Sequence, residues 1–67
     1  MIEITVNGKK RSYESAPAIP GILAEIGAPE RLVVVEVNGA VVYREDWEKT
    51  ELRDGDRVEV VTFVGGG

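Results

Sequence analysis

The chain has 67 residues, twelve of them acidic and eight basic, with a net charge of −4 and no cysteine or histidine. Without thiols or imidazoles, the chain cannot use Cys/His or Ser/His nucleophilic catalysis, form a disulfide or offer the common zinc ligands. Its negative charge argues against binding to the phosphates of nucleic acids.

The length is that of a single small domain. No apolar run approaches the roughly 20 residues that a membrane span needs, and no signal peptide opens the sequence. The clustered carboxylate loop typical of calcium sites is not visible. We therefore expect one soluble, cytoplasmic domain that binds no metal and inserts in no membrane.

A β-hairpin is predicted at the start of the chain. Residues 2–6 alternate apolar and polar side chains, which is the period of a half-buried strand. Asn7 and Gly8 follow, and both residue types accept the positive φ of a type I′ turn. The return strand is expected from Lys9 to Tyr13 or Glu14.

A short helix is predicted next. Apolar residues between positions 19 and 26 recur at i, i+3, i+4 and i+7, which gives one apolar stripe on a helix. Pro20 is tolerated only in the first turn, so the helix begins nearby. Gly27 suits the left-handed position after the last turn, and Pro29 prevents continuation. About two turns are unstable alone, so this helix must pack on a sheet.

A second hairpin follows the helix. Residues 32–37 are rich in valine and are closed by Asn38 and Gly39, a second type I′ signal. The partner strand is expected over residues 41–43.

In the remaining third of the chain, the sequence predicts a turn region followed by a last strand. Residues 44–52 are expected to form an irregular turn in which Trp47 packs as an anchor. A turn at residues 54–56 then leads into a strand over residues 57–64. The order β-β-α-β-β-β indicates an α+β fold, with a mixed sheet of about five strands packed on one helix.

Apolar side chains are expected on the solvent side of this sheet. Val61 and Phe63 share the parity of Glu59, and Val34 shares the parity of Glu36. Apolar residues clustered on an exposed face mark partner surfaces. We predict that Val34, Val61 and Phe63 contact a partner; the alternatives are a covering loop or a bulge that shifts the register.

The remaining polar groups suggest no reaction centre. The acidic residues Glu45, Asp46, Glu48, Asp54 and Asp56 could invite an acid–base mechanism. No pattern places any two of them in a pocket, and two of them belong to a turn. We predict that they form a solvated surface and that the chain has no catalytic residue.

The chain ends on three glycines directly after an apolar strand. Glycine has no Cβ, so such a tail can enter a narrow channel, and three extended residues reach roughly 10 Å. The alternative is a disordered end without a function. We divide the chain into a domain over residues 1–64 and a flexible tail over residues 65–67.

The element order and the Phe-Val-Gly-Gly-Gly end resemble the ubiquitin-like β-grasp family, and within it the ThiS-type sulfur carriers of thiamine biosynthesis. The likeness is strongest over residues 52–67, and the segments 35–39 and 44–47 are also typical. Residues 18–21 depart from the pattern, because such carriers often have a threonine cap and good helix formers there.

The resemblance implies a chemistry for the terminus. The Gly67 carboxylate would be adenylated by an ATP-using enzyme of the kind that activates ubiquitin, while Gly65 and Gly66 thread its channel. Sulfur from a donor such as a cysteine desulfurase would then give a thiocarboxylate, which thiazole synthase would use. The protein would be a cosubstrate, not an enzyme, and would bind no cofactor itself.

Other functions remain open from the sequence. Carriers of other pathways share the fold and the glycine end, among them the small subunit of molybdopterin synthase and the carriers of cysteine synthesis or tRNA thiolation. A different class would be a non-covalent β-grasp interaction module whose glycine tail is incidental.

Overall fold

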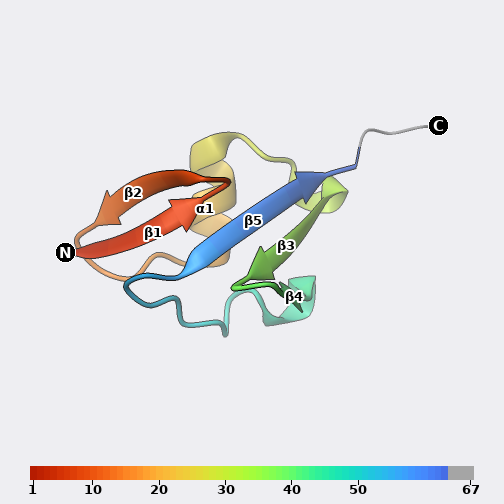
Figure 1. Ribbon diagram of the computed structural model, residues 1–67. Helices are drawn as coiled ribbons and strands as arrows, with labels where there is room; N and C mark the ends of the chain where they lie inside the picture. The colour runs from red at the N-terminus through yellow and green to blue at the C-terminus, as the bar shows by residue number, and fades with distance from the viewer. Residues whose placement is uncertain (64–67) are drawn as a thin grey trace.

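A computed structural model of the chain describes residues 1–63 (Figure 1). Its elements follow the predicted order β-β-α-β-β-β, with two short 3-10 helices in addition. They are β1 (Ile2–Val6), β2 (Lys9–Tyr13), α1 (Ile19–Ile26), η1 (Glu30–Leu32), β3 (Val33–Val37), β4 (Ala40–Val42), η2 (Arg44–Asp46) and β5 (Arg57–Thr62). The predicted α+β class is confirmed.

The strands form one mixed sheet in the order β2-β1-β5-β3-β4. The last strand, β5, therefore lies in the middle, parallel to β1 and antiparallel to β3. The helix α1 packs on one face of the sheet and leaves the other uncovered (Figure 1). This arrangement brings both hairpins against the strand that leads into the C-terminus.

Both hairpin turns have the predicted conformation. Asn7 and Gly8 have φ of 50° and 83°, and Asn38 and Gly39 have φ of 52° and 86°. Positive φ at both central residues is the type I′ pattern, whose twist matches that of the flanking strands.

The two turn asparagines also bind the central strand. The Asn7 Oδ1 accepts a hydrogen bond of 2.7 Å from the backbone N–H of Val60. The Asn38 Oδ1 accepts one of 2.9 Å from the N–H of Arg57. Each hairpin is thereby tied to β5 through the same residue that makes its turn.

The helix begins at Ile19 with Pro20 in its first turn, as predicted. The residue before it, Ala18, makes no side-chain cap, so the helix start depends on packing. Gly27 has φ of 73° and ends the helix in the left-handed conformation. The N–H of Ala28 then donates 2.9 Å to the carbonyl of Leu23, which satisfies a terminal helix carbonyl.

The core lies between α1 and the inner face of the sheet. Its buried residues are all apolar: Ile4, Val6, Ile19, Ile22, Leu23, Val35, Trp47, Leu52 and Val58. Trp47 is 3% exposed, and its Nε1 donates a hydrogen bond of 2.9 Å to the carbonyl of Val42. The predicted packing role of Trp47 is confirmed, because the indole fills the core and also anchors the end of β4.

Four strand boundaries differ from the sequence-based prediction. Leu32 belongs to η1, because its N–H bonds back to the Pro29 carbonyl at 3.0 Å, so β3 begins at Val33. The partner strand β4 begins at Ala40 and ends at Val42, one residue early at both ends, and Tyr43 leads into η2. The last strand ends at Thr62 rather than at residue 64.

Candidate functional site

The candidate site begins where the described chain ends. The N–H of Phe63 donates a hydrogen bond of 2.7 Å to the carbonyl of Leu32, just before β3 begins. This contact places the exit of the chain at the edge of the sheet shared by the end of β5 and the start of β3 (Figure 1). The structure describes residues 1–63, so Gly65, Gly66 and Gly67 lie outside the described residues and their expected functions stay predictions.

The central strand alternates between the two faces of the sheet as the sequence predicts. Val58 is fully buried and Val60 is half-buried on the helix side. Arg57, Glu59 and Val61 are exposed on the uncovered face. No bulge interrupts the pairing of β5 with β3, whose register runs without a gap from Val33 opposite Thr62 to Val37 opposite Val58.

The three predicted partner-surface residues lie together beside the chain exit. Val61 is 51% exposed and Phe63 is 56% exposed. Val34 pairs directly with Val61, so the two side chains share the uncovered face. Val34 is only half-buried, because strands β5 and β4 flank β3. That a partner binds these residues remains a prediction.

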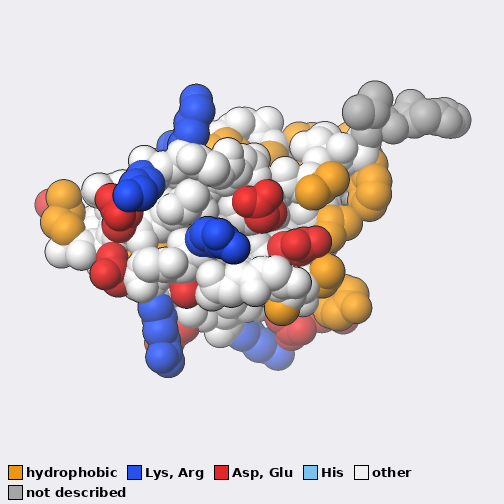
Figure 2. Space-filling model, in the orientation of Figure 1, with side chains coloured by type: hydrophobic (Ala, Val, Ile, Leu, Met, Phe, Trp, Pro, Cys, Tyr) orange, Lys and Arg blue, Asp and Glu red, His pale blue; other side chains and the backbone are white. Residues whose placement is uncertain are grey.

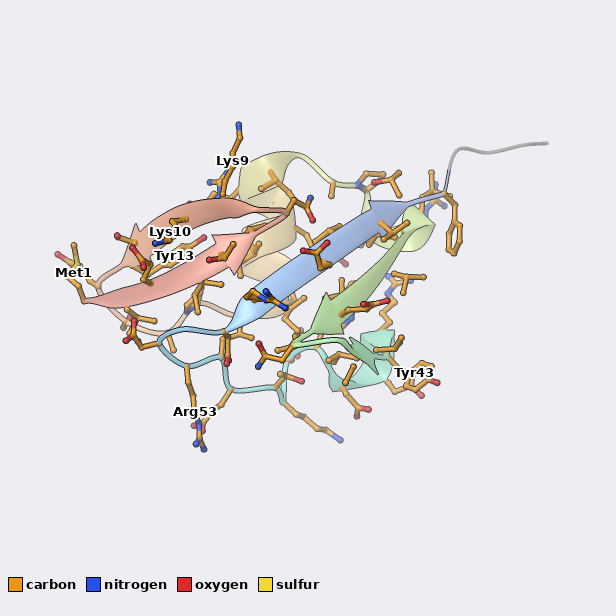
Figure 3. The ribbon with its side chains drawn as sticks, viewed as in Figure 1. Met1, Lys9, Lys10, Tyr13, Tyr43 and Arg53 are labelled. Atoms are coloured by element: carbon orange, nitrogen blue, oxygen red, sulfur yellow. The ribbon has the colours of Figure 1, made fainter. Side chains whose placement is uncertain are left out.

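The exposed apolar surface is larger than the sequence predicts. Leu32 is 44% exposed, Val41 46% and Tyr43 65%, and Tyr43 lies beyond the end of β4 (Figure 3). We call these three residues, with Val34, Val61 and Phe63, the apolar patch. Figure 2 shows hydrophobic side chains gathered at this end of the uncovered face.

Two of the missed residues carried a usable signal. The Asn38-Gly39 turn sets the register of the hairpin and so places Val41 opposite Glu36, on the outer face. Tyr43 follows at the same parity. With Val34 they line a groove of about 200 Å³ at the edge of the sheet. Nothing in the sequence indicates the exposure of Leu32, which follows from η1.

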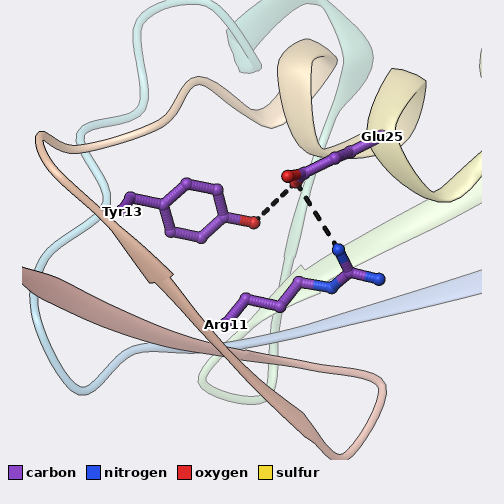
Figure 4. A network of polar contacts seen from close by, with 3 residues as sticks. All are labelled: Arg11, Tyr13 and Glu25. Carbon is purple, nitrogen blue, oxygen red and sulfur yellow. Dashed lines mark hydrogen bonds and ion pairs between the residues drawn. The ribbon is translucent and has the colours of Figure 1, made fainter.

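The face covered by α1 holds a polar cluster with a structural role (Figure 4). The Tyr13 hydroxyl donates a hydrogen bond of 2.7 Å to the Glu25 carboxylate in α1, and Arg11 lies 3.8 Å from the same carboxylate. Burial, followed by the hydrogen bond and charge of Glu25, raises the pKa of the Tyr13 hydroxyl. The cluster fastens β2 to the helix, far from the chain exit.

The carboxylates near the last turn also have structural partners. The Asp54 Oδ1 accepts 2.7 Å from the N–H of Glu3, and the Asp56 Oδ2 accepts 2.8 Å from the N–H of Arg53. Within residues 1–63, no group of three acidic side chains lies close enough to hold a metal ion. In the same part of the chain, no helix has the length and hydropathy to cross a membrane.

Comparison with known proteins identifies the relatives of the chain. The model of the ThiS family matches residues 4–67. The sulfur carrier protein ThiS of Bacillus subtilis is 34% identical over 65 residues, a match that covers 96% of this chain and 98% of the carrier.

A thiamine biosynthesis protein (ThiS) from Geobacter metallireducens has the same fold in its crystal structure. It superposes with a TM-score of 0.81 at 36% identity, and the match covers 98% of this chain and 100% of the other.

Much longer proteins also match. A thiazole synthase of Magnetococcus marinus is 40% identical over 67 residues, and one of Paramagnetospirillum magneticum is 32% identical over 66 residues. Each match covers 98% of this chain but only 20% of the thiazole synthase, so this chain spans about a fifth of their length.

Proposed function

The chain belongs to the ThiS family of sulfur carriers of thiamine biosynthesis, and we propose that it carries sulfur as a thiocarboxylate on Gly67. The observation that carries this proposal is that the family match runs to residue 67 and includes all three terminal glycines. The apolar patch beside the chain exit supports it, because a partner that takes the terminus must also contact the surface around it.

The chemistry begins with activation of a poor acyl donor. A Gly67 carboxylate oxygen attacks the α-phosphorus of ATP in an adenylating enzyme, and pyrophosphate leaves. Hydrosulfide then attacks the carbonyl carbon, and AMP leaves with the C–O electrons, so that a thiocarboxylate and a proton result. With a protein persulfide as donor, for example from a cysteine desulfurase, an acyl disulfide forms first and a second thiol reduces it.

The residues of this chain position the reaction but do not catalyse it. Gly65 and Gly66 present bare backbone to the partner's channel, since they have no side chains to collide with its walls. The chain has no cysteine thiol that could hold a sulfur atom as a persulfide, which supports the terminus as the carrier group. The protein is therefore a cosubstrate, and the ATP belongs to the activating partner.

The thiazole synthase relatives support the choice of acceptor. In those proteins a segment similar to this whole chain occupies about a fifth of a polypeptide named thiazole synthase. A carrier-like segment joined to such an enzyme indicates that the two act on a common reaction. We infer that thiazole synthase takes the sulfur from the Gly67 thiocarboxylate of this protein.

The test is a mass measurement on the intact chain. After incubation with the cognate adenylating enzyme, ATP and a sulfide donor, the protein should gain the mass of one sulfur atom in place of one oxygen atom. Fragmentation should locate the change at Gly67, and thiazole synthase should reverse it with formation of the thiazole. A chain that returns unmodified, or modified at another residue, would contradict the proposal.

A further inference from the structure

The uncovered face of the sheet carries three successive rows of side chains along β5. Arg57 belongs to the first row, Glu59 opposite Glu36 to the second, and Val61 opposite Val34 to the third, next to the chain exit. Neighbouring rows are about 7 Å apart, since two residues separate them on each strand. The face thus changes from basic to acidic to apolar as the chain approaches its exit.

The acidic row has no cation of its own. Glu36 and Glu59 are direct cross-strand partners, and like charges in that position destabilise a sheet. Within residues 1–63 neither carboxylate forms an ion pair. On its other side Glu36 is paired with Val41, so β4 supplies an apolar neighbour where a lysine or arginine would relieve the repulsion.

We propose that this face docks on the adenylating enzyme through a matching surface. On the enzyme, that surface has an apolar contact for the apolar patch, beside the mouth of the channel that takes the tail. It also has an arginine or lysine, about one row of side chains farther from the mouth, which lies between Glu36 and Glu59 of the carrier. The inference rests on the proposed function. The apolar patch supplies burial, and the carboxylate pair fixes how the carrier is rotated about its tail, because one cation must meet both carboxylates.

Charge complementarity assigns this surface to the adenylating enzyme. Its site must hold the polyphosphate of ATP and bring a second anion, the terminal carboxylate, against it, which requires cationic groups around the channel. The carrier has a net charge of −4. On the carrier, the acidic row is the row next to the apolar residues nearest the chain exit (Figure 2). In the docked complex this row would therefore lie next to the cationic groups around the enzyme's channel.

The experiment measures pyrophosphate release by the cognate adenylating enzyme with the carrier as the varied substrate, at low and high salt. The double variant Glu36→Gln, Glu59→Gln should raise KM for the carrier about tenfold at low salt and weaken its salt dependence, with kcat unchanged. Its thermal stability should equal or exceed that of the wild type, because the cross-strand repulsion is gone.

Two further variants separate docking from folding and from net charge. Glu14→Gln with Glu51→Gln removes the same charge at exposed positions outside the strands of the sheet, and its KM should stay near the wild-type value. Glu59→Lys puts an ammonium opposite Glu36, which should stabilise the carrier and still raise KM. A loss of binding in this more stable variant cannot come from unfolding.

The outcomes are distinct. An unchanged KM in the Gln variants, or an equal rise in the Glu14 and Glu51 control, would overturn the docking proposal. So would weaker binding to thiazole synthase with normal pyrophosphate release, because the pair would then serve the other partner. If the wild-type chain released no pyrophosphate at all, the proposed function would fail, whatever the variants do.

Discussion

The backbone N–H of Phe63 donates a hydrogen bond of 2.7 Å to the carbonyl of Leu32, which joins the end of β5 to the segment before β3. Four residues remain after this anchor, and an extended chain of that length reaches at most about 14 Å. A partner that binds the apolar patch must therefore hold its nucleotide within that distance of Phe63. Under the proposed function, the patch and the terminus are therefore expected to act as parts of a single binding site.

A charge at Phe63 should damage binding and spare the fold. Phe63 is 56% exposed and lies outside β5, so Phe63→Glu should change the free energy of unfolding by less than about 1 kcal/mol. The same change should raise KM for adenylation at least about tenfold, since a carboxylate would be desolvated in the interface. Urea denaturation and pyrophosphate release measure the two effects.

The matched control adds the same charge on the other side of the molecule. Ala24 is exposed on α1, so Ala24→Glu should leave both stability and KM near the wild-type values. A large loss of stability in Phe63→Glu would show that Phe63 packs in the folded protein and is not free for a partner.

Trp47→Phe tests the anchor of β4. The substitution keeps an aromatic ring in the core but removes the N–H that binds the Val42 carbonyl at 2.9 Å. An unsatisfied carbonyl costs about 1–3 kcal/mol, and the lost ring volume adds to that cost. Tyr43→Phe, at a 65% exposed position, should change stability by less than about 0.5 kcal/mol. Equal urea midpoints for the two variants would refute the role assigned to the indole.

The titration of Tyr13 gives a prediction about alkaline pH. Its pKa is raised by burial and then by Glu25, so the folded protein holds this proton above the pH at which the unfolded chain releases it. The resulting stability is complete below the unfolded pKa of about 10 and is lost as pH rises through the higher folded pKa. Tyr13→Phe should remove this part of the pH dependence.

Ultraviolet absorbance of tyrosinate measures the titration directly. In a Tyr43→Phe background Tyr13 is the remaining tyrosine of the chain. Its midpoint should fall toward the ordinary value when Glu25→Gln removes the charge beside the hydroxyl. A midpoint at or below the ordinary value in the intact cluster would contradict the assigned environment.

Local sequence signals were enough for the hairpins and the helix. The turns at Asn7 and Asn38 depend on the residues that occupy them, and Gly27 with Pro29 defines the end of α1. The central place of β5 is different, because its parallel pairing with β1 joins Thr5 to Arg57 across most of the chain. No local pattern encodes such a contact, so the sequence predicted a mixed sheet of about five strands but not the order of those strands.

The extent of the apolar patch could not be predicted for a related reason. Parity alone identified Val61 and Phe63, since alternation in a strand follows from its geometry. The exposure of Leu32 depends on where β3 begins. That boundary is set by a 3-10 turn whose hydrogen bond becomes visible only in the folded chain.

Substitution by alanine should change the stability of the protein in opposite directions at Gly21, which lies within α1, and at Gly27, which ends it. Gly21 has an ordinary helical φ and open space around the site of a Cβ, so Gly21→Ala should stabilise the protein by about 0.5–1 kcal/mol. Gly27 has φ of 73°, where a side chain is strained, so Gly27→Ala should destabilise it by about 1–2 kcal/mol. Thermal unfolding of both variants is the measurement, and changes of equal sign would contradict this account of the helix end.

The last prediction concerns the length of the terminus. Deleting Gly67, or adding one bulky residue after it, should abolish the gain of sulfur in the mass assay. The shortened chain ends before the nucleotide, and the lengthened one puts a side chain where the channel admits bare backbone. Geometry controls this step, and a misplacement of about 1 Å can cost a hundredfold in rate.

Both variants should keep the thermal stability of the wild type, because the buried core lies between Ile4 and Val58. They should also still bind the adenylating enzyme through the apolar patch, and so compete with the wild-type chain in the pyrophosphate assay. Variants that still bind but no longer gain sulfur would distinguish the docking role of the apolar patch from the chemical role of the terminus. Sulfur transfer that survived both changes would mean that the terminus is not the reactive group, and a non-covalent interaction module would then explain the fold better.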